Sequence, residues 1–164
     1  MLQKKICMLG SFAVGKTSLV RRFVESIYSD VYQTTVGVKI DKKDVRVDGK
    51  DVSLVLWDIY GEDDYQKMRW TYLRGASGYL LVADGTRKAT LEKALQLEQR
   101  VREEVGVVPF VLVMNKYDLL PDWEVDADFE SGIAAKNWNV LRSSAKTGEG
   151  VEEAFALLAR KMLG

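Results

Sequence analysis

The sequence predicts an α/β fold in which helices cover both faces of a six-stranded, mostly parallel sheet with one antiparallel edge strand. Two observations predict it. After residue 78, short apolar runs alternate with amphipathic stretches of helix length, as in strand–helix–strand units with right-handed crossovers. Earlier in the chain, two runs of alternating polarity between residues 35 and 58 meet at Asp48-Gly49. That dipeptide is a strong signal for a hairpin, whose strands pair antiparallel.

The first expected elements are a strand and a helix. "KKICMLG" (4–10) is a short apolar run that predicts a buried strand, and "GKTSLVRRFVESI" (15–27) has the spacing of an amphipathic helix. The hairpin follows, and after it a helical piece ends near "LRGASG" (73–78). Only a short segment that begins and ends with glycine, Gly10 to Gly15, joins the first strand to the first helix.

Strands and helices then alternate to the end of the sequence. The expected elements are strand 79–84, helix 90–105, strand 108–118, helix 126–138, strand 139–144 and helix 150–162. The first of these helices has apolar residues on one side, namely Leu91, Ala94, Leu95, Leu97 and Val101. Asp126 is the expected N-cap of the second. In such a sheet, ligands bind where the strands have their carboxyl ends.

The composition is that of one soluble globular domain, which we expect to span residues 1–164. Hydrophobic residues make up 47% and charged residues 29% of the chain, and no polar low-complexity tract indicates disorder. The 24 basic and 24 acidic residues cancel, so no broad basic field exists to hold a nucleic-acid backbone. We therefore expect no nucleic-acid partner, and we expect a monomer.

The chain has no histidine and a single cysteine, Cys7. This excludes His-based triads, zinc sites built from His or several Cys, and intrachain disulfides. No signal peptide or membrane-length apolar run is present, Leu2 stands where N-myristoylation needs glycine, and "ARKMLG" is not a prenylation box. We therefore expect a cytoplasmic protein with no membrane anchor in this chain.

Directly after the first strand, "GSFAVGKTS" (10–18) fits the phosphate-binding loop pattern. Its glycines let backbone N–H groups turn toward phosphate oxygens, and the following helix presents its N-terminal amides to the anion. Lys16 supplies charge to the terminal phosphates, and the Thr17 hydroxyl is placed to bind Mg²⁺. The expected nucleotide contacts in this loop are Ser11, Phe12, Ala13, Val14, Gly15, Lys16, Thr17 and Ser18.

A second motif, "NKYD" (115–118), stands at the carboxyl end of a predicted buried strand, so Asp118 is expected at the same sheet edge as the phosphate loop. Guanine presents its ring N–H beside its NH₂ group, and one carboxylate accepts from both. Adenine has no such pair and would leave the carboxylate unpaired. Alone the motif is a weak signal. It gains weight from the phosphate loop and Asp58-x-x-Gly61, which precede it in the same chain.

Together these motifs resemble the Ras superfamily of small GTP-binding proteins, nearest to the Rab and Ras branches, over essentially the whole chain. The segments that match in order are "GSFAVGKTS", "YQTTVGV" (32–38), "WDIYG" (57–61), "NKYD" and "SSAK" (143–146). "YLRGASGYLLVAD" (72–84) is similar to the Rab-like segment after the second switch. The resemblance implies a P-loop NTPase of the small G domain type that binds GTP or GDP with Mg²⁺ and hydrolyses GTP.

The resemblance also implies roles for single residues. Thr35 matches the threonine that binds Mg²⁺ and the γ-phosphate, Asp58 holds Mg²⁺ through water, and the Gly61 amide meets the γ-phosphate. Tyr28 falls where the family keeps an aromatic ring near the guanine. The implied guanine contacts are Asn115, Lys116, Asp118, Ser144, Ala145 and Lys146. The implied catalytic residues are Lys16, Thr35, Gly61 and Glu62.

Several of these residues also have a purely structural interpretation. Thr35 would then be only a strand residue, Tyr28 a packing ring, Asp58 a helix cap and Ser144 a turn hydroxyl. The joint spacing of the motifs argues against all four being structural at once.

Three residues depart from the family on the γ-phosphate side. Phe12 stands in place of a small residue, Tyr60 in place of the usual alanine and Glu62 in place of the usual glutamine. That glutamine orients the attacking water, whereas a carboxylate cannot donate to phosphate and adds charge to an anionic centre. We expect slow hydrolysis that responds poorly to an activator's arginine. The alternatives are that Glu62 is a weak base for the water, or a solvated acid pointing away.

Residues 30–45 and 58–75 hold the two expected switches and, by the resemblance, contact protein effectors and an exchange factor. Ile40, Trp57 and Tyr72 approximately match the aromatic patch that Rab-like proteins use, although core packing would also explain the rings. Two other functions stay open. One is a nearly inactive GTP-binding interaction module, and the other is a Roc-like regulatory domain cut from a larger scaffold protein.

Overall fold

The computed structural model describes residues 2–11, 13–25, 37–60 and 69–164. Twelve elements succeed one another along these ranges. They are β1 (Leu2–Gly10), α1 (Lys16–Glu25), β2 (Gly37–Val47), β3 (Lys50–Tyr60), α2 (Arg69–Leu73), β4 (Gly78–Asp84), α3 (Lys88–Glu104), β5 (Phe110–Asn115), η2 (Tyr117–Asp122), α4 (Ala127–Ala135), β6 (Val140–Arg142) and α5 (Val151–Leu163). Within the described ranges, none of the helices has the length and apolarity needed to cross a membrane.

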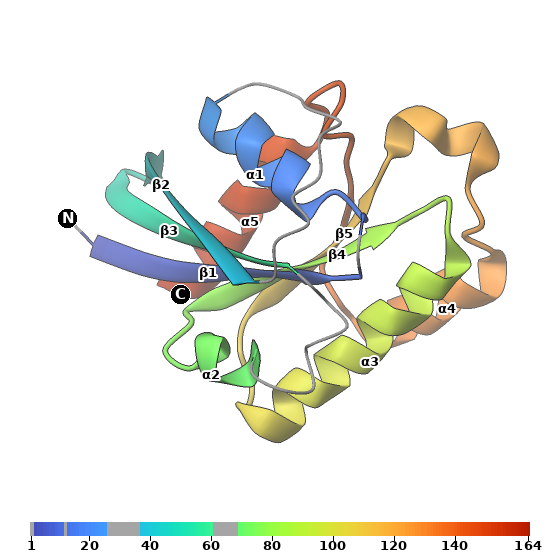
Figure 1. Ribbon diagram of the computed structural model, residues 1–164, viewed down its shortest axis with the longest axis horizontal. Helices are drawn as coiled ribbons and strands as arrows, with labels where there is room; N and C mark the ends of the chain where they lie inside the picture. The colour runs from blue at the N-terminus through green and yellow to red at the C-terminus, as the bar shows by residue number, and fades with distance from the viewer. Residues whose placement is uncertain (1, 12, 26–36, 61–68) are drawn as a thin grey trace.

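The strands form one six-stranded sheet in the order β2-β3-β1-β4-β5-β6. Four neighbouring pairs run parallel, and only β2 and β3 pair antiparallel, at the edge of the sheet. Figure 1 shows α1 and α5 on one face of the sheet and α3 and α4 on the other. The predicted fold class is therefore confirmed, including its antiparallel edge strand.

The hairpin between β2 and β3 turns at the predicted dipeptide. Asp48 and Gly49 have φ values of 50° and 80°, and Val47 pairs with Lys50 across the turn. A two-residue hairpin turn with positive φ at both positions matches the right-handed twist of the strands, and Asp-Gly tolerates it well. The local sequence therefore sets the register of the whole edge.

Two apolar cores lie on opposite faces of the sheet, and β1 contributes to both. Ile6 and Met8 belong to the core beneath α1 and α5, where Phe23 and Phe155 stack with ring centroids 4.0 Å apart. Cys7 belongs to the core beneath α3 and α4. Because successive side chains point to opposite faces, a strand buried on both sides reads as a continuous apolar run.

The segment after β5 differs from the sequence prediction. The strand ends at Asn115 instead of continuing to Asp118, because Lys116 adopts a left-handed backbone with φ 70° and ψ 38°. The short 3₁₀ helix η2, which contains Pro121, then follows between β5 and α4. Asp126 caps α4 as predicted, since its side chain accepts a hydrogen bond from the Phe129 amide at 2.8 Å. The helix ends at Ala135, and Asn137 has a φ of 56°.

A matched pair of valines tests the buried centre of the sheet. Val113 on β5 is fully buried, whereas Val107 is 93% exposed. Val113→Ala should lower the free energy of unfolding by about 2–3 kcal/mol, because it removes buried methyl groups and leaves a cavity. Val107→Ala should change it by less than about 0.5 kcal/mol. Urea denaturation of both variants measures the difference, and equal effects would contradict this placement of the core.

Candidate functional site

The carboxyl ends of four strands bring the motif residues to one edge of the sheet. Asp58 on β3 pairs with Met8 on β1, and Gly10 at the end of β1 pairs with Val82 on β4. Asp84 and Asn115, the last residues of β4 and β5, pair with each other. The phosphate loop, Asp58, Asp84 and the guanine motif therefore share one edge, as expected for a ligand site in a parallel sheet.

The predicted phosphate loop joins β1 directly to α1. Lys16 is only 5% exposed, and its Nζ donates to the Gly10 carbonyl at 2.6 Å across the loop. Gly15 has a φ of 106°, and a Cβ there would lie 2.2 Å from Asn115 Nδ2. No other residue fits that position without moving the guanine motif, so Gly15 is required for the two motifs to touch.

Asp58 lies beside Thr17, beyond the loop. The Thr17 hydroxyl donates to Asp58 Oδ2 at 2.6 Å, and the Asp58 side chain is fully buried. Asp58 Oδ1 is also buried and has no hydrogen-bond partner among the described residues. Burial raises the pKa of Asp58, although the Thr17 hydrogen bond and the nearby Lys16 charge oppose the shift. Because Asp58 stands in a strand, the helix-cap interpretation is wrong.

The Thr17–Asp58 pair fits a magnesium site of the kind that a nucleotide completes. A buried carboxylate oxygen without a partner favours a cation, and Mg²⁺ prefers a few oxygen ligands together with waters and substrate phosphates. No group of three or more His, Cys, Asp or Glu side chains forms a metal cage in the described part of the chain.

Asn115 connects three segments through its side chain. Its Nδ2 donates to the Val14 carbonyl of the phosphate loop at 2.9 Å. Its Oδ1 accepts from the Ser143 hydroxyl at 3.1 Å and from the Ala145 amide at 3.2 Å. Asn115 is 2% exposed, so these bonds form away from water. They hold "NKYD", "SSAK" and the phosphate loop together.

Ser144 links the other end of the guanine motif to "SSAK". Its hydroxyl donates to Asp118 Oδ1 at 2.7 Å and also accepts from the Thr147 amide at 3.1 Å. Ser144 is thus both a turn hydroxyl and a support for Asp118. Asp118 is exposed and Ala145 is buried, while Lys146 is exposed and its carbonyl accepts from Arg22 at 3.1 Å. The carboxylate is therefore held in place while it faces solvent.

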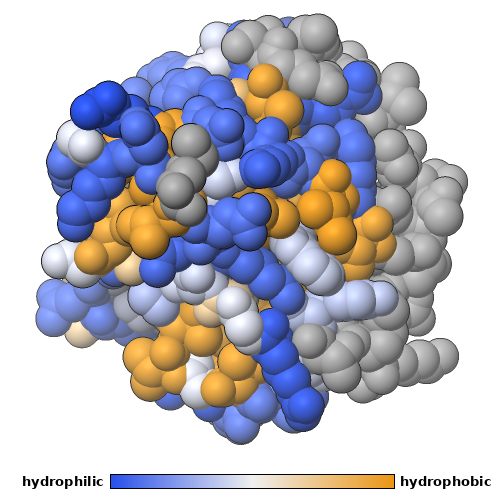
Figure 2. All heavy atoms as spheres, turned by 90° about the vertical axis from the view of Figure 1, so that its left-hand side faces the viewer, coloured by the Kyte–Doolittle hydropathy of each residue, from blue (hydrophilic) through white to orange (hydrophobic). Residues whose placement is uncertain are grey.

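Some predicted site residues lie outside the described residues, namely Phe12, Tyr28, Thr35, Gly61 and Glu62. Of the predicted partner surface, Ile40 on β2 is 53% exposed. Trp57 and Tyr72 are half-buried, with ring centroids 5.8 Å apart, and pack against the α3-side core. Figure 2 shows the β2–β3 end of the molecule, where hydrophobic side chains gather in small areas separated by polar ones.

Asp84 is a residue that the sequence analysis missed. Its side chain is 1% exposed, and Oδ2 lies 2.9 Å from Lys116 Nζ and 2.9 Å from Arg87 Nε. The missed signal is its place as the last residue of "YLLVAD", because an acid that ends a buried parallel strand reaches the ligand edge as Asp58 does. Trp123, which contacts Lys116 from the other side, has no such sequence signal.

The fold and the loop define a P-loop nucleotide-binding protein. The chain belongs to the Ras family, whose model matches residues 5–164. It is 34% identical over 161 residues to the Ras-related protein Rab-1 of Theileria parva, covering 96% of this chain and 73% of the relative. It is 36% identical over 162 residues to human Ras-related protein Rab-4A, covering 97% and 74%. It is therefore a Ras-like, Rab-like GTP-binding GTPase.

The unpartnered oxygen of Asp58 predicts how the protein responds to loss of metal. In EDTA and without nucleotide, Asp58→Asn should raise the free energy of unfolding at pH 7. Burial raises the pKa of Asp58 and so makes its ionisation unfavourable in the folded wild type, a cost that the neutral amide avoids. The pKa of Asp58 is higher in the folded than in the unfolded protein. The cost of ionisation to stability is therefore absent below the unfolded pKa and is complete once the pH has risen through the folded pKa. The advantage of the variant should therefore shrink on acidification.

Urea denaturation at several pH values measures this effect. Asp44→Asn, at an exposed site on β2, is the matched control and should show little change. When Mg²⁺ and GDP are restored, the wild type should gain more stability than Asp58→Asn. A variant that is less stable than wild type in EDTA would contradict this account of Asp58.

Proposed function

We propose that this protein is a guanine-nucleotide switch that holds GTP or GDP with Mg²⁺ and hydrolyses GTP slowly. The observation that carries the proposal is the set of Asn115 side-chain bonds, which join the phosphate loop to both guanine motifs. Because these bonds fix the base-binding and phosphate-binding segments relative to each other, one nucleoside phosphate can contact both at once.

The phosphate side of the proposed site uses backbone and charge. Ser11, Ala13, Val14, Gly15 and Ser18 contribute backbone of the loop and the start of α1, where backbone N–H groups and the helix dipole favour anions. Lys16 would exchange its bond to the Gly10 carbonyl for phosphate oxygens. Thr17 and Asp58 would hold Mg²⁺, with Thr35 as the third expected contact. Bound Mg²⁺ neutralises charge on the terminal phosphates.

On the base side of the proposed site, Asp118 recognises the guanine by accepting hydrogen bonds from it. Ser144 holds one carboxylate oxygen of Asp118, which orients the group to accept from the two adjacent donors of guanine. The Lys116 and Lys146 stems would complete the site. The Ala145 amide donates to Asn115 Oδ1 and would share that hydrogen with the base. An adenine base would leave Asp118 unpaired, and that loss supplies the discrimination.

Slow hydrolysis is proposed from the three departures on the γ-phosphate side. A Glu62 carboxylate accepts a proton or a hydrogen bond from water, but its negative charge repels the phosphate. A glutamine amide carries no charge and would not repel it. Phe12 and Tyr60 would occupy the entrance through which an activator's arginine reaches the phosphates. An arginine finger raises the rate of GTP hydrolysis about 10³- to 10⁵-fold in such enzymes, so its exclusion leaves hydrolysis slow.

Partner binding is proposed for residues 30–45 and 58–75. The exposed Ile40 on the edge strand supports a contact surface there, and the half-buried Trp57 and Tyr72 present their remaining surface beside it. Those two rings also pack on the core, so partner binding would be a second role for them. The cytoplasmic location and the monomeric state stay predictions.

One experiment tests the switch against the nearly inactive module. The purified protein is denatured, the released nucleotide is identified by chromatography, and loaded GTP is followed over hours. We expect GDP to be recovered and loaded GTP to disappear slowly, about 10- to 100-fold slower than with a glutamine-bearing relative. Recovered GTP with no measurable turnover would favour the module. Recovered ATP, or no nucleotide, would contradict the proposed function.

The sign of one substitution then separates the two catalytic interpretations of Glu62. Glu62→Gln should accelerate hydrolysis, because an amide orients water without repelling the phosphate. If Glu62 is instead a weak base, the same change lowers the rate. Asp63→Asn removes the same charge one residue further on and is the matched control, with no change expected.

A further inference from the structure

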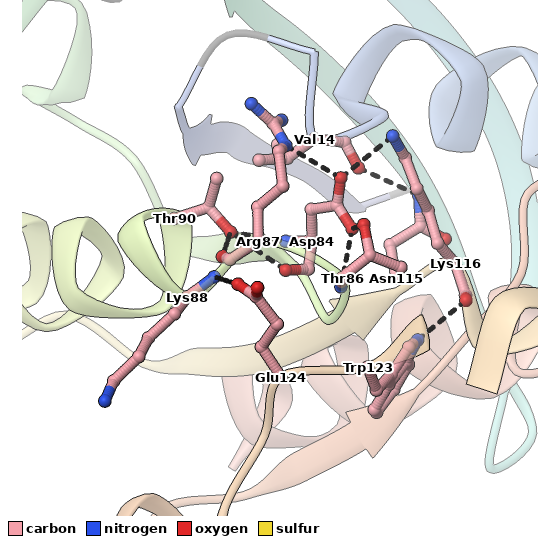
Figure 3. A network of polar contacts seen from close by, with 10 residues as sticks. All are labelled: Val14, Asp84, Thr86, Arg87, Lys88, Thr90, Asn115, Lys116, Trp123 and Glu124. Atoms are coloured by element: carbon pink, nitrogen blue, oxygen red, sulfur yellow. Dashed lines mark hydrogen bonds and ion pairs between the residues drawn. The ribbon is translucent and has the colours of Figure 1, made fainter. Parts of the chain in front are cut away.

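Asp84 is a buried carboxylate with an unusually complete set of partners. Its Oδ1 accepts from the Thr86 amide at 2.9 Å and from the Thr86 hydroxyl at 2.6 Å. Its Oδ2 is shared by Arg87 and Lys116 (Figure 3). Burial raises the pKa of Asp84, but the hydrogen bonds from Thr86, Lys116 and Arg87 together hold that pKa below its ordinary value. The group therefore stays ionised at neutral pH and presents a fixed negative charge to Lys116.

Lys116 is held at both of its ends. Its ammonium group contacts Asp84, and its carbonyl accepts a hydrogen bond from Trp123 Nε1 at 2.8 Å. Figure 3 shows the two partners at opposite ends of the residue, Asp84 at the ammonium group and Trp123 at the carbonyl. Between these points the backbone is left-handed, a conformation that costs a residue with a Cβ roughly 1 kcal/mol or more. Such strain persists only where neighbouring groups enforce it.

The Trp123 ring is itself locked against the end of β4. A Cβ on Gly85 would lie 2.3 Å from the indole Cε2 atom, so the ring covers the Gly85 backbone closely. Gly85 donates its amide to the Asn115 carbonyl at 3.1 Å and accepts from the Glu124 amide at 2.8 Å. Glu124 in turn accepts from the Lys88 amide at the start of α3 at 2.6 Å. Hydrogen bonds therefore join the end of β4, the end of β5, the segment after η2 and the start of α3 around Lys116.

From this arrangement we propose that Asp84 and Trp123 are positioning residues that hold Lys116 against the guanine base and thereby set how long the nucleotide stays bound. The proposal rests on the proposed function, because it takes Lys116 to lie beside the base. Lys116 stands between Asn115, which anchors the motif, and Asp118, which reads the base. A lysine whose side chain and backbone are both fixed before binding loses little conformational freedom when the nucleotide arrives.

The charge of Asp84 is the part that a substitution isolates. Asp84→Asn keeps the shape of the side chain and can still accept from Thr86, but it offers no anion to Lys116. The ammonium group then loses a charge-assisted bond in a site with little water. Trp123→Phe keeps a ring over Gly85 but removes the N–H group that donates to the Lys116 carbonyl. Both changes release the same lysine from opposite ends.

Release of a fluorescent GDP analogue, followed after addition of excess GDP, measures the effect. Asp84→Asn should speed release about 10- to 100-fold and Trp123→Phe about 3- to 10-fold, as expected for loss of a charged and a neutral hydrogen bond. Glu98→Gln is the matched control. Glu98 is also a buried carboxylate, 5% exposed and 2.7 Å from Arg102, but it lies within α3 away from the motifs. It should leave release unchanged even if thermal unfolding shifts.

A double-mutant comparison shows whether Asp84 acts through Lys116. Lys116→Met keeps the apolar stem and removes the charge, so release is expected to be fast in this variant. Adding Asp84→Asn to it should then speed release by less than about twofold, because the interaction is already gone. An Asp84→Asn effect that is equally large in both backgrounds would overturn the proposal, since Asp84 would then act through another group.

The remaining outcomes separate this proposal from the proposed function. If the wild type holds the GDP analogue but Asp84→Asn and Trp123→Phe release it no faster than Glu98→Gln, this proposal alone fails. If the wild type binds no guanine nucleotide, the proposed function fails and this proposal fails with it. If Asp84→Asn does not fold, Trp123→Phe decides: faster release supports the proposal, and unchanged release overturns it.

Discussion

The candidate site depends on the contacts of Asn115. This buried side chain bonds to the phosphate loop at Val14 and to "SSAK" at Ser143 and Ala145. The bonds are formed where no water can replace them, so each lost bond would leave a buried polar group unpaired. The close approach also explains Gly15, because a side chain there would collide with the Asn115 amide. One amide thus fixes three loops that lie far apart in sequence.

Much of the fold follows from local patterns in the sequence. The apolar run of β1 predicts the strand correctly because both faces of the strand are buried. The Asp48-Gly49 turn sets the hairpin register through its backbone conformation alone. The motif residues Lys16, Thr17, Asp58, Asn115 and Asp118 meet at one edge as predicted, since parallel strands deliver their carboxyl ends there. Periodicity and topology are sufficient for these features.

Other features depend on tertiary contacts that local patterns do not contain. The sequence around Lys116 does not predict its left-handed backbone. The two groups that hold its ends, Asp84 on β4 and Trp123 after η2, reach it only in the folded chain. That conformation is also why β5 ends at Asn115, three residues before the predicted end of the strand at Asp118. The pairing of Asp84 with Lys116 needs β4 and β5 to be neighbours, which is known only once the strand order is known.

If this sheet edge reads a guanine base through Asp118, as proposed, competition between nucleotides is the most direct test. Bound GDP analogue is displaced by GDP, ADP or xanthosine diphosphate, which carries a carbonyl where guanine has its NH₂ group. Wild type should prefer GDP over both by at least about 100-fold. Asp118→Asn, whose amide donates to that carbonyl, should shift the preference toward xanthosine diphosphate. Equal displacement by GDP and ADP, or an unchanged preference in Asp118→Asn, would contradict the account.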